Sequence, residues 1–257
     1  MALLEGLVIN HPSEDGEVVP GVAERWESDA ENRVWTFHLR DSARWTNGDP
    51  VTAHDFVFSH HRILNPDLGA EYAEMLYVIA GAREFHNGEI ADFEKVGVEA
   101  LDDHTLRYRL VGPTPHFLQM HLHYTFWPVH PPTIQEFGAW DNPATNWTQP
   151  GNFVGNGPFM LEKWRVNQVI EVAKNPTYWD AESVRLNAIR FFPLGDLNSS
   201  DRAFLAGQLH KSNGVPFNKR RAVGRDSSEV KRAPSPPLRP SPSRTRACAR
   251  YNKQPQN

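Results

Sequence analysis

The sequence predicts an α/β protein with mixed sheets, followed by a disordered basic tail. Two observations predict the folded part: runs of alternating apolar and polar residues recur along the chain, and segments with apolar residues at helical intervals separate them. A third observation predicts the tail. Residues 1–219 carry 29 acidic and 17 basic side chains, a balance of −12, whereas residues 220–257 carry 2 and 10, a balance of +8. With Tyr251 as its only aromatic residue, the tail cannot bury enough apolar surface to offset its ordering entropy.

The folded part begins with a clear strand pattern and a capped helix. Apolar and polar side chains alternate over residues 34–40, which predicts a strand with one exposed face. Asn47 and Gly48 then predict a turn. Thr52 and Asp55 have the spacing of a capping box, and the apolar residues that follow at helical intervals predict a helix that ends at Asn65.

A second helix and a hairpin follow. Residues 71–85 place several apolar side chains, Tyr72 among them, on one helical face, which predicts a single helix. Residues 96–101 and 105–110 have strand patterns about the short polar turn 102–104. Two strands about so short a turn predict a hairpin.

The remaining elements are shorter and separated by turn residues. The prolines at 113 and 115 predict the start of a short helix through residue 122, and the Pro-, Asn- and Trp-rich segment 128–150 predicts a long ordered connection. The pattern then predicts three strands and a final helix, over residues 159–164, 170–174, 189–192 and 201–209.

The composition excludes several classes of protein. The single cysteine, Cys248, cannot pair within the chain and cannot build a zinc site alone. No apolar stretch approaches the roughly 20 residues that a membrane-spanning helix requires. The sequence lacks the common motifs of serine hydrolases, zinc proteases and nucleotide-binding proteins. The nearest match to a phosphate loop, Gly155-Asn156-Gly157, precedes a proline and a strand pattern, so we interpret it as a turn.

A group of histidines keeps one enzymatic alternative open. His116, His121, His123 and His130 fall within fifteen positions, and imidazoles two residues apart on a strand share a face. No Asp or Glu lies among them, so a metal site would need a further ligand from elsewhere in the chain. This alternative is a metal-dependent hydrolase built on the His116–His130 cluster, and we expect no bound cofactor otherwise.

The tail offers a second alternative. Its arginines could neutralise nucleic-acid phosphates. The folded part, however, carries a balance of −12, and the tail lacks aromatic residues interleaved with its basic ones. We therefore expect no nucleic acid among the partners of this protein.

A series of ordered motifs resembles one family. The motifs are similar to those of the periplasmic oligopeptide-binding proteins, which are the family 5 extracellular solute-binding proteins of peptide ABC transporters. The resemblance covers about residues 1–219. It rests on the runs at residues 19–26 (VPGVAERW), 34–40 (VWTFHLR), 43–57 (ARWTNGDPVTAHDFV), 101–106 (LDDHTL), 147–150 (WTQP), 156–159 (NGPF), 174–180 (KNPTYWD) and 206–210 (AGQLH).

This resemblance implies a function without catalysis. Members capture oligopeptides through backbone contacts in a cleft between two lobes and deliver them to the membrane permease of an ABC transporter. It implies a monomer in the periplasm, although residues 1–6 do not have the pattern of a secretory signal. By the same resemblance, Tyr72 matches an aromatic residue that lines the cleft and Asn213 a polar residue that contacts the peptide backbone, with His123 as a further cleft residue.

The resemblance also implies a division of the chain. The fold would be that of a type II periplasmic binding protein, with one incomplete lobe. Residues 1–33 and 139–219 would form that lobe, and residues 34–138 a small inserted α/β subdomain. The second lobe would be missing, so we expect the chain to bind peptides weakly or not at all.

The basic tail, residues 220–257, does not resemble the family. Its abrupt change to Arg, Pro, Ser and Ala is typical of a GC-rich gene read out of frame, so we hypothesise a frameshift near codon 220. Translating the coding DNA in the other two frames tests this hypothesis. If neither frame continues the family pattern, the hypothesis is wrong.

Overall fold

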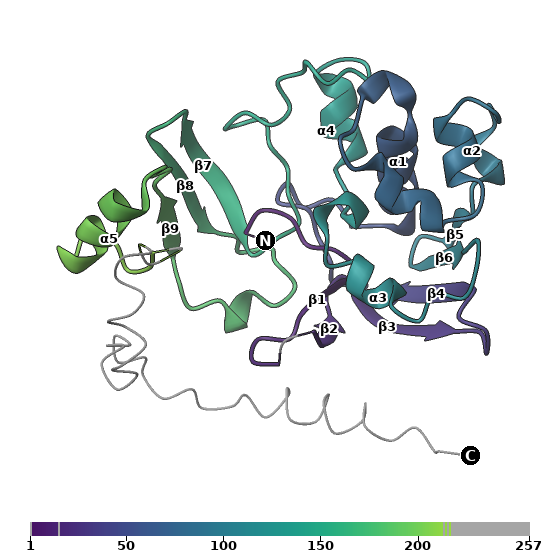
Figure 1. The fold of residues 1–257 in the computed structure, drawn as a ribbon, viewed down its shortest axis with the longest axis horizontal. Coiled ribbons are helices and arrows are strands. Elements are labelled where there is room, and N and C mark those ends of the chain that lie inside the picture. The colour runs from purple at the N-terminus through teal and green to yellow at the C-terminus, as the bar shows by residue number, and fades with distance from the viewer. Residues whose placement is uncertain (1, 15, 213, 215, 217–257) are drawn as a thin grey trace. The chain divides into compact units, whose positions relative to one another are not determined.

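The protein was analysed as a computed structural model that describes residues 2–14, 16–212, 214 and 216 (Figure 1). The chain divides into two units, Met1–Pro193 and Leu194–Asn257. The first unit holds three antiparallel sheets with their covering helices, and the described part of the second holds one helix. The predicted tail, residues 220–257, and Asn213 lie outside the described residues.

A four-stranded antiparallel sheet forms the centre of the first unit. Its order is β3-β4-β6-β5, with β3 at Ala23–Ser28, β4 at Val34–Leu39, β6 at Thr105–Arg109 and β5 at Val98–Asp102. Burial alternates along β4, with Trp35, Phe37 and Leu39 inward, which confirms the predicted strand. The β5–β6 hairpin is confirmed as well.

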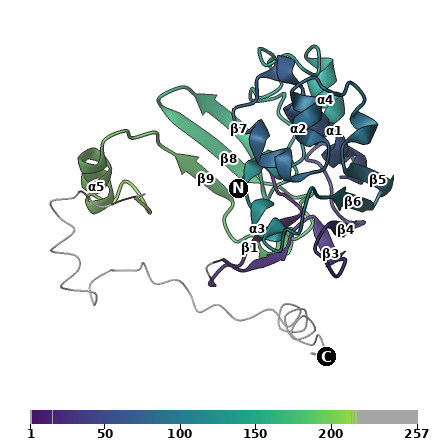
Figure 2. The same ribbon diagram turned by 45° about the vertical axis from the view of Figure 1, so that its right-hand side comes forward.

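Helix α1, Ala53–Leu64, packs on β5 and β6, as Figures 1 and 2 show from two sides. The capping box is present: the Thr52 side chain accepts from the N3 backbone, and Asp55 Oδ2 accepts from the Thr52 backbone N–H at 2.8 Å. The same carboxyl oxygen accepts from the indole N–H of the fully buried Trp45 at 3.0 Å. Asp55 therefore joins the start of the helix to the core.

Replacing Asp55 by Ala is expected to lower the free energy of unfolding by about 2 kcal/mol. The change removes a helix cap, worth about 1 kcal/mol, and leaves the buried Trp45 N–H without its acceptor, which costs about 1 kcal/mol or more. Urea unfolding measures the loss. Asp92→Ala is the matched control, because Asp92 caps only the exposed 3-10 helix Phe93–Lys95. Equal losses in the two variants would contradict this account of Asp55.

The predicted single helix over residues 71–85 is wrong. The structure has a 3-10 helix, η2, at Ala73–Val78 and a short helix, α2, at Ala82–His86. Between them the chain pairs like a strand: Ile79 forms a β-bridge with Leu110, and Ala80 N–H donates to the Arg109 carbonyl at 2.9 Å. Tertiary hydrogen bonding thus overrides the helical pattern.

Glycine at position 81 is required where α2 begins. Its φ is +74°, a left-handed conformation that side chains disfavour. A Cβ there would also lie 2.8 Å from the Lys95 carbonyl oxygen. The chain therefore turns sharply into α2 instead of continuing one helix.

The second half of the unit contains a three-stranded sheet of order β7-β8-β9. The strands are β7, Phe159–Arg165, β8, Val169–Lys174, and β9, Ala188–Phe191, which confirms the three predicted strands. Near the N-terminus, β1, Val8–Asn10, pairs with β2, Val18–Pro20. The remaining short elements are η1, Pro66–Leu68, η3, Phe93–Lys95, α3, Phe117–Met120, η4, Tyr124–Phe126, and η5, Ala181–Ser183.

Two expected boundaries need correction. The segment 128–150 is not only a connection, because Pro131–Glu136 forms helix α4, with the His130 side chain accepting from the Thr133 N–H at its start. The last helix, α5, is Leu197–Leu205, so it begins earlier than expected. Asp196 explains this start, because its carboxylate accepts from the backbone N–H groups of Asn198 and Ser199.

The division into 1–33, 34–138 and 139–219 stays a prediction. Strand β3 lies before residue 34 and pairs directly with β4, which lies after it. The first expected boundary therefore falls within a hairpin of the central sheet.

Candidate functional site

Two of the three residues predicted for the site lie together on the surface. The rings of Tyr72 and His123 are 5.3 Å apart between centroids, and Tyr124 lies 5.9 Å from Tyr72 and 4.1 Å from His123. Tyr72 is 41% exposed and Tyr124 56% exposed, so neither is a core residue. We call Tyr72, His123 and Tyr124 the aromatic surface. The third predicted residue, Asn213, lies outside the described residues.

Two 3-10 helices position the aromatic surface. Tyr72 is the residue before η2, and His123 is the residue before η4. His123 Nδ1 accepts from the Thr125 backbone N–H, and the Thr125 hydroxyl lies 2.9 Å from the same nitrogen. The neutral ring then carries its proton on Nε2, where it can donate to a carbonyl group. The surface therefore offers aromatic faces for packing and an N–H donor.

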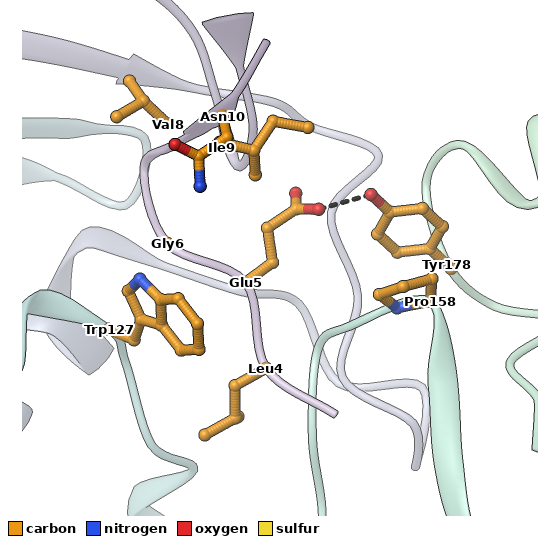
Figure 3. Close-up of a pocket in the computed structure, with 9 residues that line it drawn as sticks. All are labelled: Leu4, Glu5, Gly6, Val8, Ile9, Asn10, Trp127, Pro158 and Tyr178. Carbon is orange, nitrogen blue, oxygen red and sulfur yellow. Dashed lines mark hydrogen bonds between the residues drawn. The ribbon is translucent and has the colours of Figure 1, made fainter. Parts of the chain in front are cut away.

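A separate cavity of about 220 Å³ lies beside the N-terminal segment. Figure 3 shows the Glu5 side chain at this cavity with its hydrogen bond from the Tyr178 hydroxyl. Trp179 Nε1 also donates to the Glu5 carboxyl, at 2.7 Å. The cavity is lined by Leu4, Glu5, Gly6, Val8, Ile9, Asn10, Trp127, Pro158 and Tyr178.

Burial raises the pKa of the Glu5 carboxyl to about 7, although the hydrogen bonds from Tyr178 and Trp179 and the charge of Arg40 lower it. The Arg40 guanidinium stacks on Trp179, 3.9 Å from the ring centroid. Glu5 is only 5% exposed. Glu5 is not among the residues predicted for the site, although an acidic residue inside the apolar run 3–8 is itself a signal of a buried, partnered carboxyl.

The loop at Gly155-Asn156-Gly157 holds this N-terminal segment in place. Asn156 Nδ2 donates to the Glu5 carbonyl and its Oδ1 accepts from the Glu5 N–H, both at 2.9 Å. Gly157 N–H donates to the Leu3 carbonyl at 3.1 Å. The loop is thus a tight contact between two chain segments, and the structure has a bend at Gly157 where we expected a turn.

The four clustered histidines do not converge on one point. His116 is exposed and His121 is fully buried, whereas His130 pairs with Asp49 at 3.0 Å and contacts the Thr133 hydroxyl at 2.8 Å. Among the described residues no group of three or more His, Cys, Asp or Glu side chains could hold a metal ion. Nothing in the structure supports the hydrolase alternative.

The fold is that of the type II periplasmic binding proteins, because the chain superposes with the unliganded open form of the murein tripeptide-binding protein MppA with a TM-score of 0.80 at 35% identity. The chain belongs to the bacterial extracellular solute-binding proteins, family 5, whose sequence profile matches residues 17–243. The match runs past residue 219, where we expected the resemblance to end. No described helix is long and apolar enough to cross a membrane.

Several proteins are similar in sequence to most of this chain. The periplasmic oligopeptide-binding protein OppA of Escherichia coli is 38% identical over 213 residues, and the periplasmic murein peptide-binding protein MppA of the same organism is 37% identical over 218 residues. These matches cover 82% and 84% of this chain but only 37% and 38% of the relatives. The chain therefore spans less than two fifths of the length of either protein.

Solved structures agree with this assignment. The Escherichia coli murein tripeptide binding protein MppA superposes with a TM-score of 0.79 at 35% identity, covering 87% of this chain and 42% of that one. Haemophilus influenzae OppA, solved in complex with the peptide RPPGFSPFR, superposes with a TM-score of 0.80 at 32% identity, covering 88% and 43%. The predicted family and the type II fold are thereby confirmed. The expected mixed sheets are wrong, because all strand pairs in the three described sheets are antiparallel.

Proposed function

We propose that this chain is part of the solute-binding component of a peptide ABC transporter. It captures oligopeptides in the periplasm and passes them to a membrane permease, without catalysis and as a monomer. The observation that carries this proposal is membership of family 5, with relatives that are named as oligopeptide- and murein peptide-binding proteins. The aromatic surface supports it, because two residues expected to line a cleft lie side by side there.

The chemistry of the aromatic surface suits peptides of varied sequence. A receptor for such ligands gains affinity from the peptide backbone, which every ligand shares, and leaves side chains in roomy, hydrated pockets. His123 Nε2–H can donate to a backbone carbonyl, and the rings of Tyr72 and Tyr124 provide flat faces for packing. Asn213 would supply a further backbone contact.

The proposed division of the chain bears on how a peptide would be held. We propose that residues 1–33 and 139–219 belong to one lobe, that residues 34–138 form a subdomain inserted into it, and that residues 220–257 form a tail. High affinity in a two-lobed receptor depends on closure of both lobes over the ligand. Residues 1–219 would supply one side of such a cleft, so tight binding would depend on a second lobe that closes over the ligand.

Calorimetric titration of the 257-residue chain with tri- to pentapeptides tests this proposal. For residues 1–257 by themselves we expect dissociation constants of about 1 mM or weaker, because the single lobe that we propose for them would contact one side of the ligand. A sub-micromolar dissociation constant would show that the chain closes a complete site by itself, and would overturn the proposed division into lobes.

A further inference from the structure

Two histidines lie buried in the core beneath the aromatic surface. His60 belongs to α1, and His121 is the residue that ends α3. Both are 0% exposed. Each ring lies one helical turn after a carbonyl group of its own helix: His60 Nδ1 is 2.7 Å from the Phe56 oxygen, and His121 Nδ1 is 2.9 Å from the Phe117 oxygen.

These contacts fix the protonation of both rings. A carbonyl oxygen only accepts hydrogen bonds, so each Nδ1 must carry a proton, and each neutral ring keeps its lone pair on Nε2. His60 Nε2 lies 3.3 Å from the Tyr108 hydroxyl, which can donate to it. His121 Nε2 is buried and has no hydrogen-bond partner among the described residues. A second proton on His121 would therefore have no acceptor among the described residues, and one on His60 would require the Tyr108 hydroxyl to change from donor to acceptor.

Aromatic rings surround the pair. His121 lies between 4.4 and 5.3 Å, centroid to centroid, from Phe117, Phe126, Phe37 and Tyr108. His60 contacts two of the same rings, Tyr108 at 5.6 Å and Phe126 at 5.9 Å. The titratable groups that act on this cluster are the two imidazoles and the Tyr108 phenol, whose pKa is raised by burial. The nearest carboxyl of α1, Asp55, is engaged by Thr52 and Trp45.

The buried pair connects directly to the aromatic surface. His123 and Tyr124 follow His121 in the chain, and Phe126, the last residue of η4, touches both buried imidazoles. The segment from α3 to η4 thus has its buried side on the histidine pair and its exposed side in the candidate site. A change in the packing of His121 or Phe126 would therefore act on the short segment that carries His123 and Tyr124.

We propose that His60 and His121 form an acid-responsive pair, whose protonation breaks the aromatic core under α3 and η4 and so dismantles the aromatic surface. Both rings are 0% exposed, and no carboxylate among the described residues acts on them, so a cation in this core would be poorly stabilised and its formation would favour opening of the core. The consequence for ligands, release of bound peptide in acid, rests on the proposed function. The loss of stability in acid does not depend on that function.

The direction of the effect follows from the protonation of the two states. Burial lowers the pKa of His60 to about 4 and that of His121 to about 3, from an ordinary 6.5. Below pH 6.5 the unfolded chain binds these protons and the folded chain does not. The stability that the two neutral imidazoles contribute is therefore complete above pH 6.5 and is lost as pH falls toward 4. Each imidazole lowers the folding equilibrium constant about tenfold per pH unit in this range.

Urea unfolding at several pH values between 7.5 and 5 tests the proposal without any peptide. We compare the wild type with His121→Phe, which fills the same aromatic site without a titrating group, and with His116→Gln, which removes an exposed histidine beside it. From pH 6 to pH 5 the folding equilibrium constant of the wild type and of His116→Gln should fall about tenfold more than that of His121→Phe. Equal pH dependence in all three would overturn the proposal.

A measurement on the wild type decides the question if His121→Phe does not fold. The ring proton resonances of His60 and His121 should keep the neutral chemical shift from pH 7.5 to pH 5 while the protein stays folded. Titration of either ring with a midpoint between pH 6 and 7 in the folded protein would overturn the proposal. Because neither experiment contains peptide, failure here is distinct from failure of the proposed function.

Discussion

Replacing Gly155 by Ala is expected to lower the free energy of unfolding by about 3 kcal/mol. A Cβ on residue 155 would lie 2.1 Å from the Leu3 carbonyl oxygen, which is backbone and cannot rotate away. The N-terminal segment would have to leave the loop, and the hydrogen bonds between Asn156 and Glu5 would be lost with it. Urea unfolding measures the effect.

The control for this substitution is Gly112→Ala. No atom lies within 4 Å of a Cβ placed on Gly112, and its φ is not in the left-handed region. Its stability should therefore stay within a few tenths of a kcal/mol of the wild type or rise slightly. If Gly155→Ala is as stable as Gly112→Ala, the N-terminal segment does not pack against the loop as described.

Replacing Glu5 by Gln is expected to raise stability at neutral pH relative to acidic pH. The folded-state pKa of Glu5 is raised to about 7, above its ordinary 4.5. The stability that the protonated Glu5 carboxyl contributes is therefore complete below pH 4.5 and is lost as pH rises through 7. The stability difference between Glu5→Gln and the wild type should shift by about 3 kcal/mol in favour of the variant from pH 4.5 to pH 8.

Urea unfolding across this pH range provides the measurement, with Glu14→Gln as the control at an exposed acidic residue near the same terminus. The free energy of unfolding of Glu14→Gln should change with pH as that of the wild type does. A constant difference between Glu5→Gln and the wild type would show that Glu5 ionises normally. Between pH 4.5 and 6.5, a rise in pH lowers the stability that Glu5 contributes and raises the stability that the buried histidines contribute. Only comparison with variants separates the two contributions.

Elements encoded by neighbouring residues could be predicted from the sequence. The alternation over residues 34–40, the spacing of Thr52 and Asp55 and the short turn at residues 102–104 are all local patterns, and each gave the expected element. The helix expected over residues 71–85 failed because Ile79 and Ala80 pair with residues near 110. Hydrogen bonds to a distant strand leave no trace in a local pattern.

The same distinction between local patterns and contacts of distant residues holds for the candidate site. Residue periodicity placed Tyr72 on the apolar face of a helix, and only the family resemblance assigned it to a cleft. The structure places His123 beside Tyr72. The acid at Glu5 could have been recognised as unusual within its apolar run. Its partners, Tyr178 and Trp179, lie 173 and 174 residues away and could not be read from the sequence.

The most direct test of the central claim is NMR of the aromatic surface during titration with a tripeptide at millimolar concentration. We expect the ring resonances of Tyr72, His123 and Tyr124 to shift with peptide. Tyr72→Ala should abolish the shifts of His123 and Tyr124, and Trp164→Ala should leave all three unchanged. Trp164 is the matched control, because it is an aromatic residue of nearly equal exposure, 42% against 41%, on β7. Absence of shifts at these three residues, or shifts that persist in Tyr72→Ala, would contradict the account.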